Sequence, residues 1–149
     1  MKKATATVIF SVLISMSSLG VSATLQSMNK AQFKEAFINN TFVSIATDNL
    51  NGRTIDNTFS MFLDDKGNIW GKMSSKPENE PQTDQGTYSI ADDGTFYITW
   101  QHWDGAKPLC GHVFYTENAY ISVDCDNIFH TAFMKETIKS GNHLERLEN

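Results

Sequence analysis

The stretch CGHVFYTENAYISVDC, residues 110–125, begins and ends with a cysteine and carries turn residues at its centre. A turn about Glu117-Asn118 would place Cys110 directly opposite Cys125. Directly opposed residues of an antiparallel strand pair have Cα atoms about 4.5–5.5 Å apart, which is within the range that a disulfide accepts. The pattern therefore predicts a β-hairpin closed by a structural disulfide, worth about 3 kcal/mol on the chain-entropy model.

Short apolar runs bounded by turn residues repeat along the rest of the chain, which is the signature of consecutive strands. A short helix should precede them: Ser27 can cap it, Phe33 and Phe37 share one side, and Asn39-Asn40 would end it. Consecutive hairpins form a meander, so we expect a mainly β fold: a single antiparallel meander forming a small barrel or a strongly curved sheet. The further strands are expected at residues 41–45, 59–63, 69–73, 87–90, 95–100 and 128–134, with a helical turn at 135–139.

The first 23 residues have the order of a secretory signal peptide. Lys2 and Lys3 precede an apolar run that is densest from Val8 to Ile14, and Val21-Ser22-Ala23 offers small residues at a cleavage site. The alternative is an uncleaved anchor, but the run is shorter and more polar than the ~20 apolar residues of a spanning helix. We therefore expect residues 24–149 to form a single β-rich domain that is periplasmic or secreted, with no membrane span after cleavage.

Composition and motifs restrict the function classes. The chain has a formal net charge of −5 and no basic cluster, which argues against a nucleic-acid partner. No phosphate loop, dinucleotide fingerprint or Gly-x-Ser-x-Gly occurs, so no cofactor is expected and catalysis would need an unrecognised motif. No metal site is expected either, because the candidate ligands lack compact spacing; those residues are His102, His112, His130, Asp104, Asp124 and Asp126.

One histidine falls on an apolar face of the predicted hairpin. Because side chains alternate along a strand, Cys110, His112 and Phe114 lie on one face of the predicted hairpin. We expect that face to point inward because it is otherwise apolar. His112 would then be either a hydrogen-bonded core imidazole or a group that lines a ligand cavity. The residues expected to join this face from the second strand are Ile121, Val123 and Cys125.

Two tryptophans flank another histidine where a strand runs into a loop. Trp100 should point inward with Phe96 and Ile98, and Trp103 should lie in the loop. Loop aromatics are common in binding sites and partner anchors, although Trp103 could equally cover the barrel mouth. The candidate ligand-binding residues are therefore His112, Trp100, Trp103, His102 and Phe114.

The order of these elements resembles small exported bacterial lipocalin-like (calycin-like) domains of unknown function. The resemblance rests on Asn40-Thr41-Phe42, on Gly86-Thr87-Tyr88-Ser89-Ile90 with the Asp92-Asp93-Gly94 turn, and on Trp100, and it spans about residues 41–126. It implies a barrel-like fold that binds a ligand or a partner, and it implies no catalytic residue.

Two candidate functions are consistent with these observations. The first is a binding module that holds an apolar or amphipathic small molecule in the barrel, since such sites are concave, mostly apolar and carry few polar groups. The second is a protein-binding domain, such as an inhibitor, an immunity protein or a secreted host-interaction factor, that uses the loops around Lys76–Gln85 and Trp103. A hollow barrel would favour the first function and a filled barrel the second.

Overall fold

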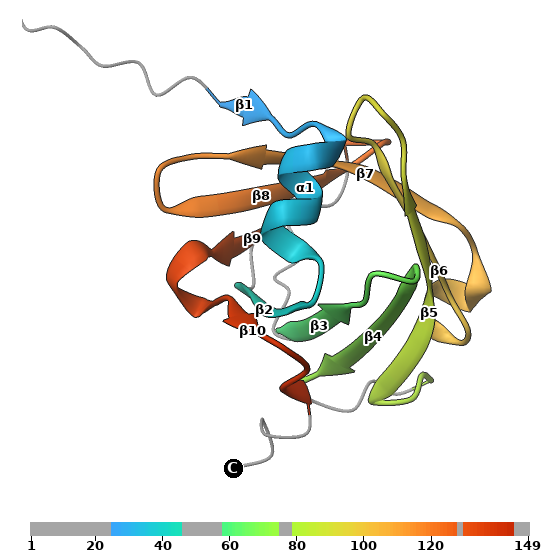
Figure 1. Cartoon of the computed structure of the whole chain (residues 1–149). Helices are drawn as coiled ribbons and strands as arrows, with labels where there is room; N and C mark the ends of the chain where they lie inside the picture. Colours follow the sequence, from blue (N-terminus) through green and yellow to red (C-terminus); the bar gives the residue numbers. More distant parts are fainter. Residues whose placement is uncertain (1–24, 46–57, 75–78, 128–129, 145–149) are drawn as a thin grey trace, which may run out of the picture.

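The computed structural model describes residues 25–45, 58–74, 79–127 and 130–144. Residues 1–23, predicted to be a signal peptide, lie outside these ranges. The described part is mainly β (Figure 1). Its strands are β1 (Gln26–Ser27), β2 (Asn40–Ile45), β3 (Phe59–Leu63), β4 (Asn68–Met73), β5 (Thr83–Ile90), β6 (Phe96–Trp100), β7 (Leu109–Tyr115), β8 (Ala119–Asp124), β9 (His130–Met134) and β10 (Lys139–Ser140).

Strands β2 to β9 form a closed antiparallel barrel. Each pairs with the next along the chain, and β9 returns to pair with β2 at Ser44↔Phe133, which closes the sheet. The short strands β1 and β10 extend the sheet beside β7 and β2. The predicted meander is therefore confirmed as a closed barrel, the arrangement that removes free edges from the sheet.

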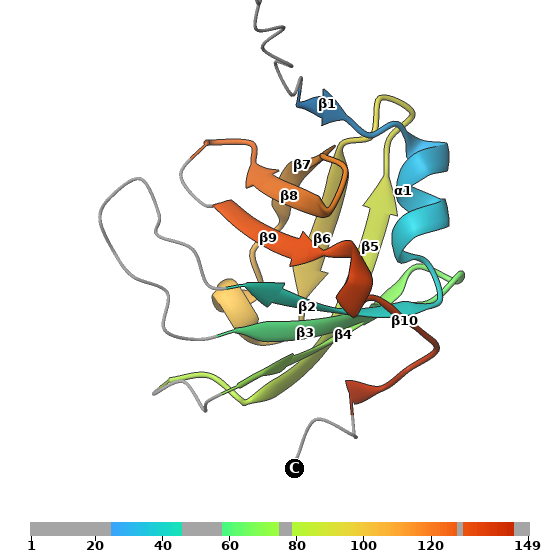
Figure 2. The same ribbon diagram turned by 90° about the vertical axis from the view of Figure 1, so that its left-hand side faces the viewer.

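The helix α1 (Lys30–Phe37) lies across one end of the barrel (Figures 1 and 2). Its N-cap is Asn29, in a capping box with Gln32, and not Ser27 as expected; Ser27 belongs to β1. Asn29 caps the helix because its side chain accepts a hydrogen bond from the backbone N–H of Gln32, while the Gln32 side chain accepts one from the backbone N–H of Asn29. The helix presents Phe33 and Phe37, both buried, to the barrel interior.

The opposite end of the barrel is covered by a short turn, η1 (Trp103–Ala106). In Figure 2 this turn, in light orange, lies on the left, whereas α1 lies on the right. The Trp103 side chain is 3% exposed and packs against Trp100, with ring centroids 4.7 Å apart. Both ends of the barrel are thus covered by aromatic side chains, one pair from α1 and one pair from the strand β6 and η1.

The hairpin β7–β8 has the register expected from the sequence. His112 pairs with Val123 and Phe114 with Ile121, as a turn about residues 117–118 requires. The Cα atoms of Cys110 and Cys125 are 5.6 Å apart and their sulfur atoms are at bonding distance. The disulfide therefore links β7 to the residue that follows β8.

Candidate functional site

The barrel interior is almost completely filled by side chains. The cavity enclosed by the inward-facing side chains of the described strands and α1 measures about 30 Å³. This is room for one or two water molecules, compared with ~300–1,000 Å³ for typical ligand sites. Phe37, Leu63 and Ile69 are at most 1% exposed at its centre. The interior offers no space for a small-molecule ligand in this conformation.

The candidate residues His112 and Phe114 lie on the outer face of the barrel, not on the inner face as expected. Their neighbour Val113 is buried and lines the interior cavity, and alternate residues of a strand point to opposite faces. The Thr95 hydroxyl lies 3.5 Å from Nδ1 of the His112 ring.

On the β7–β8 hairpin the inward face is less apolar than the outward face. This is possible because large aromatic side chains from other elements fill the space beneath it. A Cβ on Gly111 would lie 2.6 Å from Cζ of Phe96, so only a glycine fits opposite that ring. Ser122 likewise faces the interior cavity. The apolar content of one hairpin alone is therefore a poor guide to its buried face when the neighbouring elements already fill the core.

A buried carboxylate, Asp84, holds the loop that carries His102 and Trp103. One oxygen of Asp84 accepts the backbone N–H groups of His102 and Trp103, each at 2.8 Å. The other lies 2.9 Å from Nδ1 of His102 and from the backbone nitrogen of Gln85. The side chain is 1% exposed, so this charge is sealed beneath the loop.

The same donors keep Asp84 ionised. Burial on its own would raise the pKa of this carboxyl, but the hydrogen bonds from Trp103, His102 and Gln85 outweigh that effect and hold the pKa below its ordinary value. The carboxylate also orients the imidazole of His102, which is 65% exposed at the surface. Asp84 was expected in the loop Lys76–Gln85; instead β5 begins at Thr83 and brings Asp84 under the 101–106 loop.

Trp103 is fixed by contacts from three directions. Its indole N–H donates to the Pro81 carbonyl oxygen at 2.6 Å, and its backbone N–H to Asp84. Below it lies Gly71 of β4, where a Cβ would come within 2.7 Å of Cη2 of Trp103 and 2.8 Å of Cη2 of Trp100. Trp103 was expected either to anchor a ligand or partner or to cover the barrel mouth, and in the structure it covers the mouth. Trp100 points inward with Phe96 and Ile98.

After Trp103 the backbone makes three consecutive left-handed residues. Asp104, Gly105 and Ala106 have φ values of 56°, 63° and 57°. The Asp104 backbone N–H donates to Oε1 of Glu80 at 3.0 Å, so the 79–85 segment braces this turn as well. All three residues are exposed, and a Cβ at Gly105 would meet no atom within 4 Å. Of the first loop predicted to bind a partner, residues 76–78 lie outside the described ranges, and its described residues 79–85 are joined to the Trp103 loop in one surface.

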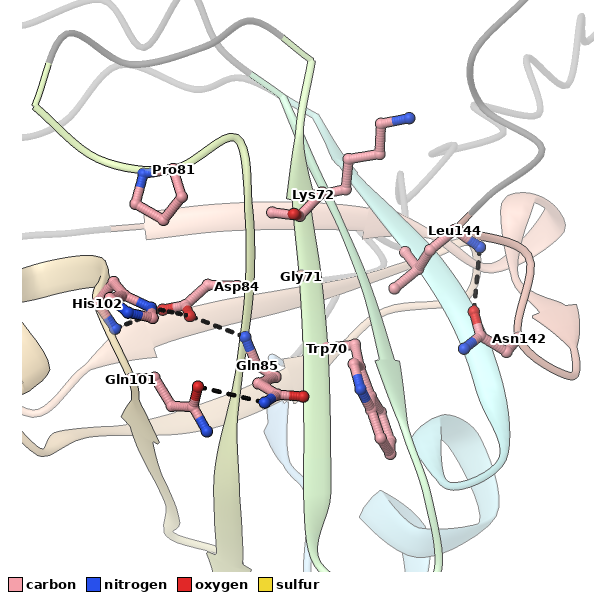
Figure 3. A pocket seen from close by; sticks show the side chains of 11 residues that line it. Trp70, Gly71, Lys72, Pro81, Asp84, Gln85, Gln101, His102, Asn142 and Leu144 are labelled. Atoms are coloured by element: carbon pink, nitrogen blue, oxygen red, sulfur yellow. Dashed lines mark hydrogen bonds and ion pairs between the residues drawn. The ribbon is translucent and has the colours of Figure 1, made fainter.

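A groove of about 590 Å³ runs along the outer face of β4 and β5 beside these loops (Figure 3). Trp70 and Gln85 are paired across the two strands, and His102 lies next to them on the loop. Leu144 and Asn142, from the segment after β10, form the other side. The sequence predicted His102 as a site residue and placed Gln85 at the end of a partner-binding loop, but Trp70 was not predicted, although its outward position was readable from strand alternation. The approach of residues 142–144 had no local signal.

The described residues contain no group of three or more His, Cys, Asp and Glu side chains placed to hold a metal ion. Within the same ranges, no helix is both long and apolar enough to cross a bilayer. Comparison with known proteins finds no matching family model, no matching curated relative and no matching solved structure.

Proposed function

We propose that this chain is an exported protein-binding domain, of the inhibitor, immunity or host-interaction type, that docks through its two joined loops. The observation that carries the proposal is the contrast between a filled barrel and a rigid, exposed turn. An interior cavity of about 30 Å³ leaves the small-molecule alternative without a site inside the barrel. The leader-like residues 1–23 and the disulfide support export.

The exposed turn is held in a conformation that its residues would not choose alone. Left-handed φ values cost roughly 1 kcal/mol or more for residues other than glycine, and both Asp104 and Ala106 adopt them. The hydrogen bonds that Glu80, Pro81 and Asp84 accept from Trp103 and Asp104 maintain this conformation. A turn that is already ordered loses little entropy on docking, which favours tight association.

The charge of this surface favours a basic partner. Glu80 and Asp104 meet at the turn, and desolvation, followed by the nearby Glu80 charge, raises the pKa of Asp104 above its ordinary value. A Lys or Arg of the partner would offset the repulsion between the two carboxylates, and the net charge of −5 on the whole chain would speed its approach.

The proposal is tested by site-specific photo-crosslinking. The full chain, carrying a benzophenone amino acid in place of Lys107, is produced in the organism from which the sequence comes. The cells are irradiated, and adducts are identified by mass spectrometry. Lys107 is exposed beside the left-handed turn; Ser89, exposed at the far end of β5, is the matched control position. We expect one protein to be captured from position 107 and not from position 89.

The captured protein is then purified, and its affinity is measured by calorimetry. Glu80→Gln and Asp104→Asn each keep the size of the side chain, and we expect each to weaken binding by roughly threefold to tenfold and to reduce its salt dependence. Asp65→Asn, in the exposed β3–β4 turn, is the control and should bind as the wild type does. The proposal is wrong if position 107 captures nothing, or if both loop variants bind with unchanged affinity.

A further inference from the structure

We propose that the outer groove is a second binding site, for a neutral oligosaccharide. This inference goes beyond the proposed protein docking, and the residues that carry it, Trp70, Gln85 and Gln101, take no part in that docking. The groove volume of about 590 Å³ lies within the range of sites that hold small molecules, whereas the interior cavity does not. Its chemistry is that of a surface that recognises hydroxyl groups and a flat, weakly polar face.

Flat side chains lie in a row across adjacent strands on the outer face of the barrel. Phe62 of β3 pairs with Trp70 of β4, and Trp70 pairs with Gln85 of β5. Gln101, just after β6, continues the row, because its backbone N–H donates to the Gln85 carbonyl oxygen at 2.9 Å. Figure 3 shows Trp70, Gln85 and Gln101 side by side along the groove.

The two carboxamides are linked so that the pair presents both a donor and an acceptor. Nε2 of Gln85 donates to Oε1 of Gln101 at 3.2 Å. In this orientation Oε1 of Gln85 can accept and Nε2 of Gln101 can donate to a ligand. A hydroxyl group is itself both donor and acceptor, so neighbouring hydroxyls of a sugar match the pair. Both glutamines are exposed.

Trp70 supplies the apolar part of the site. Its ring is supported from one side by Phe62, with centroids 5.7 Å apart and planes tilted by 36°. The C–H face of a pyranose ring packs on an indole in the way that other flat apolar groups do. Leu144 lines the groove as well. A wholly apolar ligand would desolvate Gln85 and Gln101 without replacing their hydrogen bonds, which is unfavourable.

The groove does not present the acidic character of the rest of the chain. Its one lining carboxylate, Asp84, is sealed, and Nδ1 of His102 is turned toward it. The cationic side chain among the lining residues is Lys72, which is 9% exposed and extends toward the rim in Figure 3. The surface left to a ligand is therefore formed chiefly by amide, imidazole and indole groups, which suits a neutral polyhydroxylated molecule.

The test is a titration of the isotope-labelled full chain with neutral tetrasaccharides, namely cellotetraose, maltotetraose and N-acetylchitotetraose, followed by NMR. We expect at least one of them to shift the Trp70 indole and the Gln85 and Gln101 side-chain amide signals. Tetragalacturonate, which is anionic, and a mixture of neutral tetrapeptides are the comparison ligands. Binding of either comparison ligand in preference to all three sugars overturns the proposal, as does the absence of shifts from any sugar at millimolar concentration.

Variants separate this site from the protein-docking surface. Trp70→Ala should weaken sugar binding by roughly tenfold and Trp70→Phe by less, because the aromatic face contributes a comparable free energy. Tyr97→Ala removes another exposed aromatic residue, 45% exposed on β6, and should leave binding unchanged. Equal binding by the wild type and by Trp70→Ala would refute the site. Trp70→Phe should retain crosslinking from position 107, so the two proposals can fail independently.

Discussion

The carboxylate of Asp84 accepts the backbone N–H of Trp103 at 2.8 Å, although 19 residues separate them in the chain. This bond joins the start of β5 to the turn η1. It determines where the mouth of the barrel ends and where the exposed surface begins, because Trp103 packs inward and Asp104 lies outside. Three consequences of this geometry can be measured, and a fourth prediction concerns the disulfide.

Asp84→Asn should destabilise the fold by roughly 3 kcal/mol. The substituted amide turns an NH₂ group toward backbone donors that the carboxylate satisfied, and hydrogen bonds to a charged, buried group are worth about 1.5–3 kcal/mol each. Urea unfolding monitored by tryptophan fluorescence measures the change, because Trp100 and Trp103 lie at this mouth. Asp65→Asn, in an exposed turn, is the matched control. Equal midpoints for the two variants would contradict this account of Asp84.

Acid should weaken the wild type more than Asp84→Asn. The folded-state pKa of Asp84 is held below the ordinary value of 3.8, so its contribution is fully present above that pH. The contribution is lost as the pH falls from about 3.8 through the lowered folded-state pKa. The hydrogen bond from the Thr95 backbone N–H also lowers the pKa of Asp93, but this contribution to the pH dependence is the same in the wild type and in Asp84→Asn. Free energies of unfolding measured between pH 6 and pH 2 should therefore converge, and parallel curves would argue against a buried ionised Asp84.

Gly71→Ala should loosen the mouth of the barrel. The new methyl group would overlap the rings of Trp100 and Trp103, and overpacking of this kind costs about 1–3 kcal/mol. We also expect a red-shifted tryptophan emission in the native state, since Trp103 must move toward water. Gly105→Ala is a useful comparison because its methyl meets no atom within 4 Å and adds only left-handed strain, roughly 1 kcal/mol. Unchanged emission from Gly71→Ala would show that the indoles do not close over Gly71.

Replacing Cys110 and Cys125 by serine should lower the free energy of unfolding by about 3 kcal/mol on the chain-entropy model. The strand pairing His112↔Val123 should persist, since the hairpin has its own backbone ladder. Differential scanning calorimetry of the double variant gives the first quantity, and NMR contacts between the two strands give the second. A variant that keeps the wild-type melting temperature would show that the bridge does not restrict the unfolded chain.

Features set by neighbouring residues were predictable from the sequence. The strand Phe59–Leu63 has the bounds expected from its alternation, and the β7–β8 register follows from the turn position. The inner and outer faces of that hairpin were assigned wrongly because the packing partner of Gly111 is Phe96, on another strand. The role of Asp84 was missed for the same reason: its donors come from a loop that only the folded barrel brings near.

The barrel is completed by the pairing of Ser44 with Phe133, so the first strand of the barrel, β2, can pair fully only when the last one, β9, is available. Topologies that depend on such distant pairings fold slowly, since much of the chain must be gathered first. A newly made chain would therefore lack the closed barrel until its C-terminal part has emerged. That delay would suit the export proposed above, in which the chain passes through a narrow translocation channel before it folds on the far side.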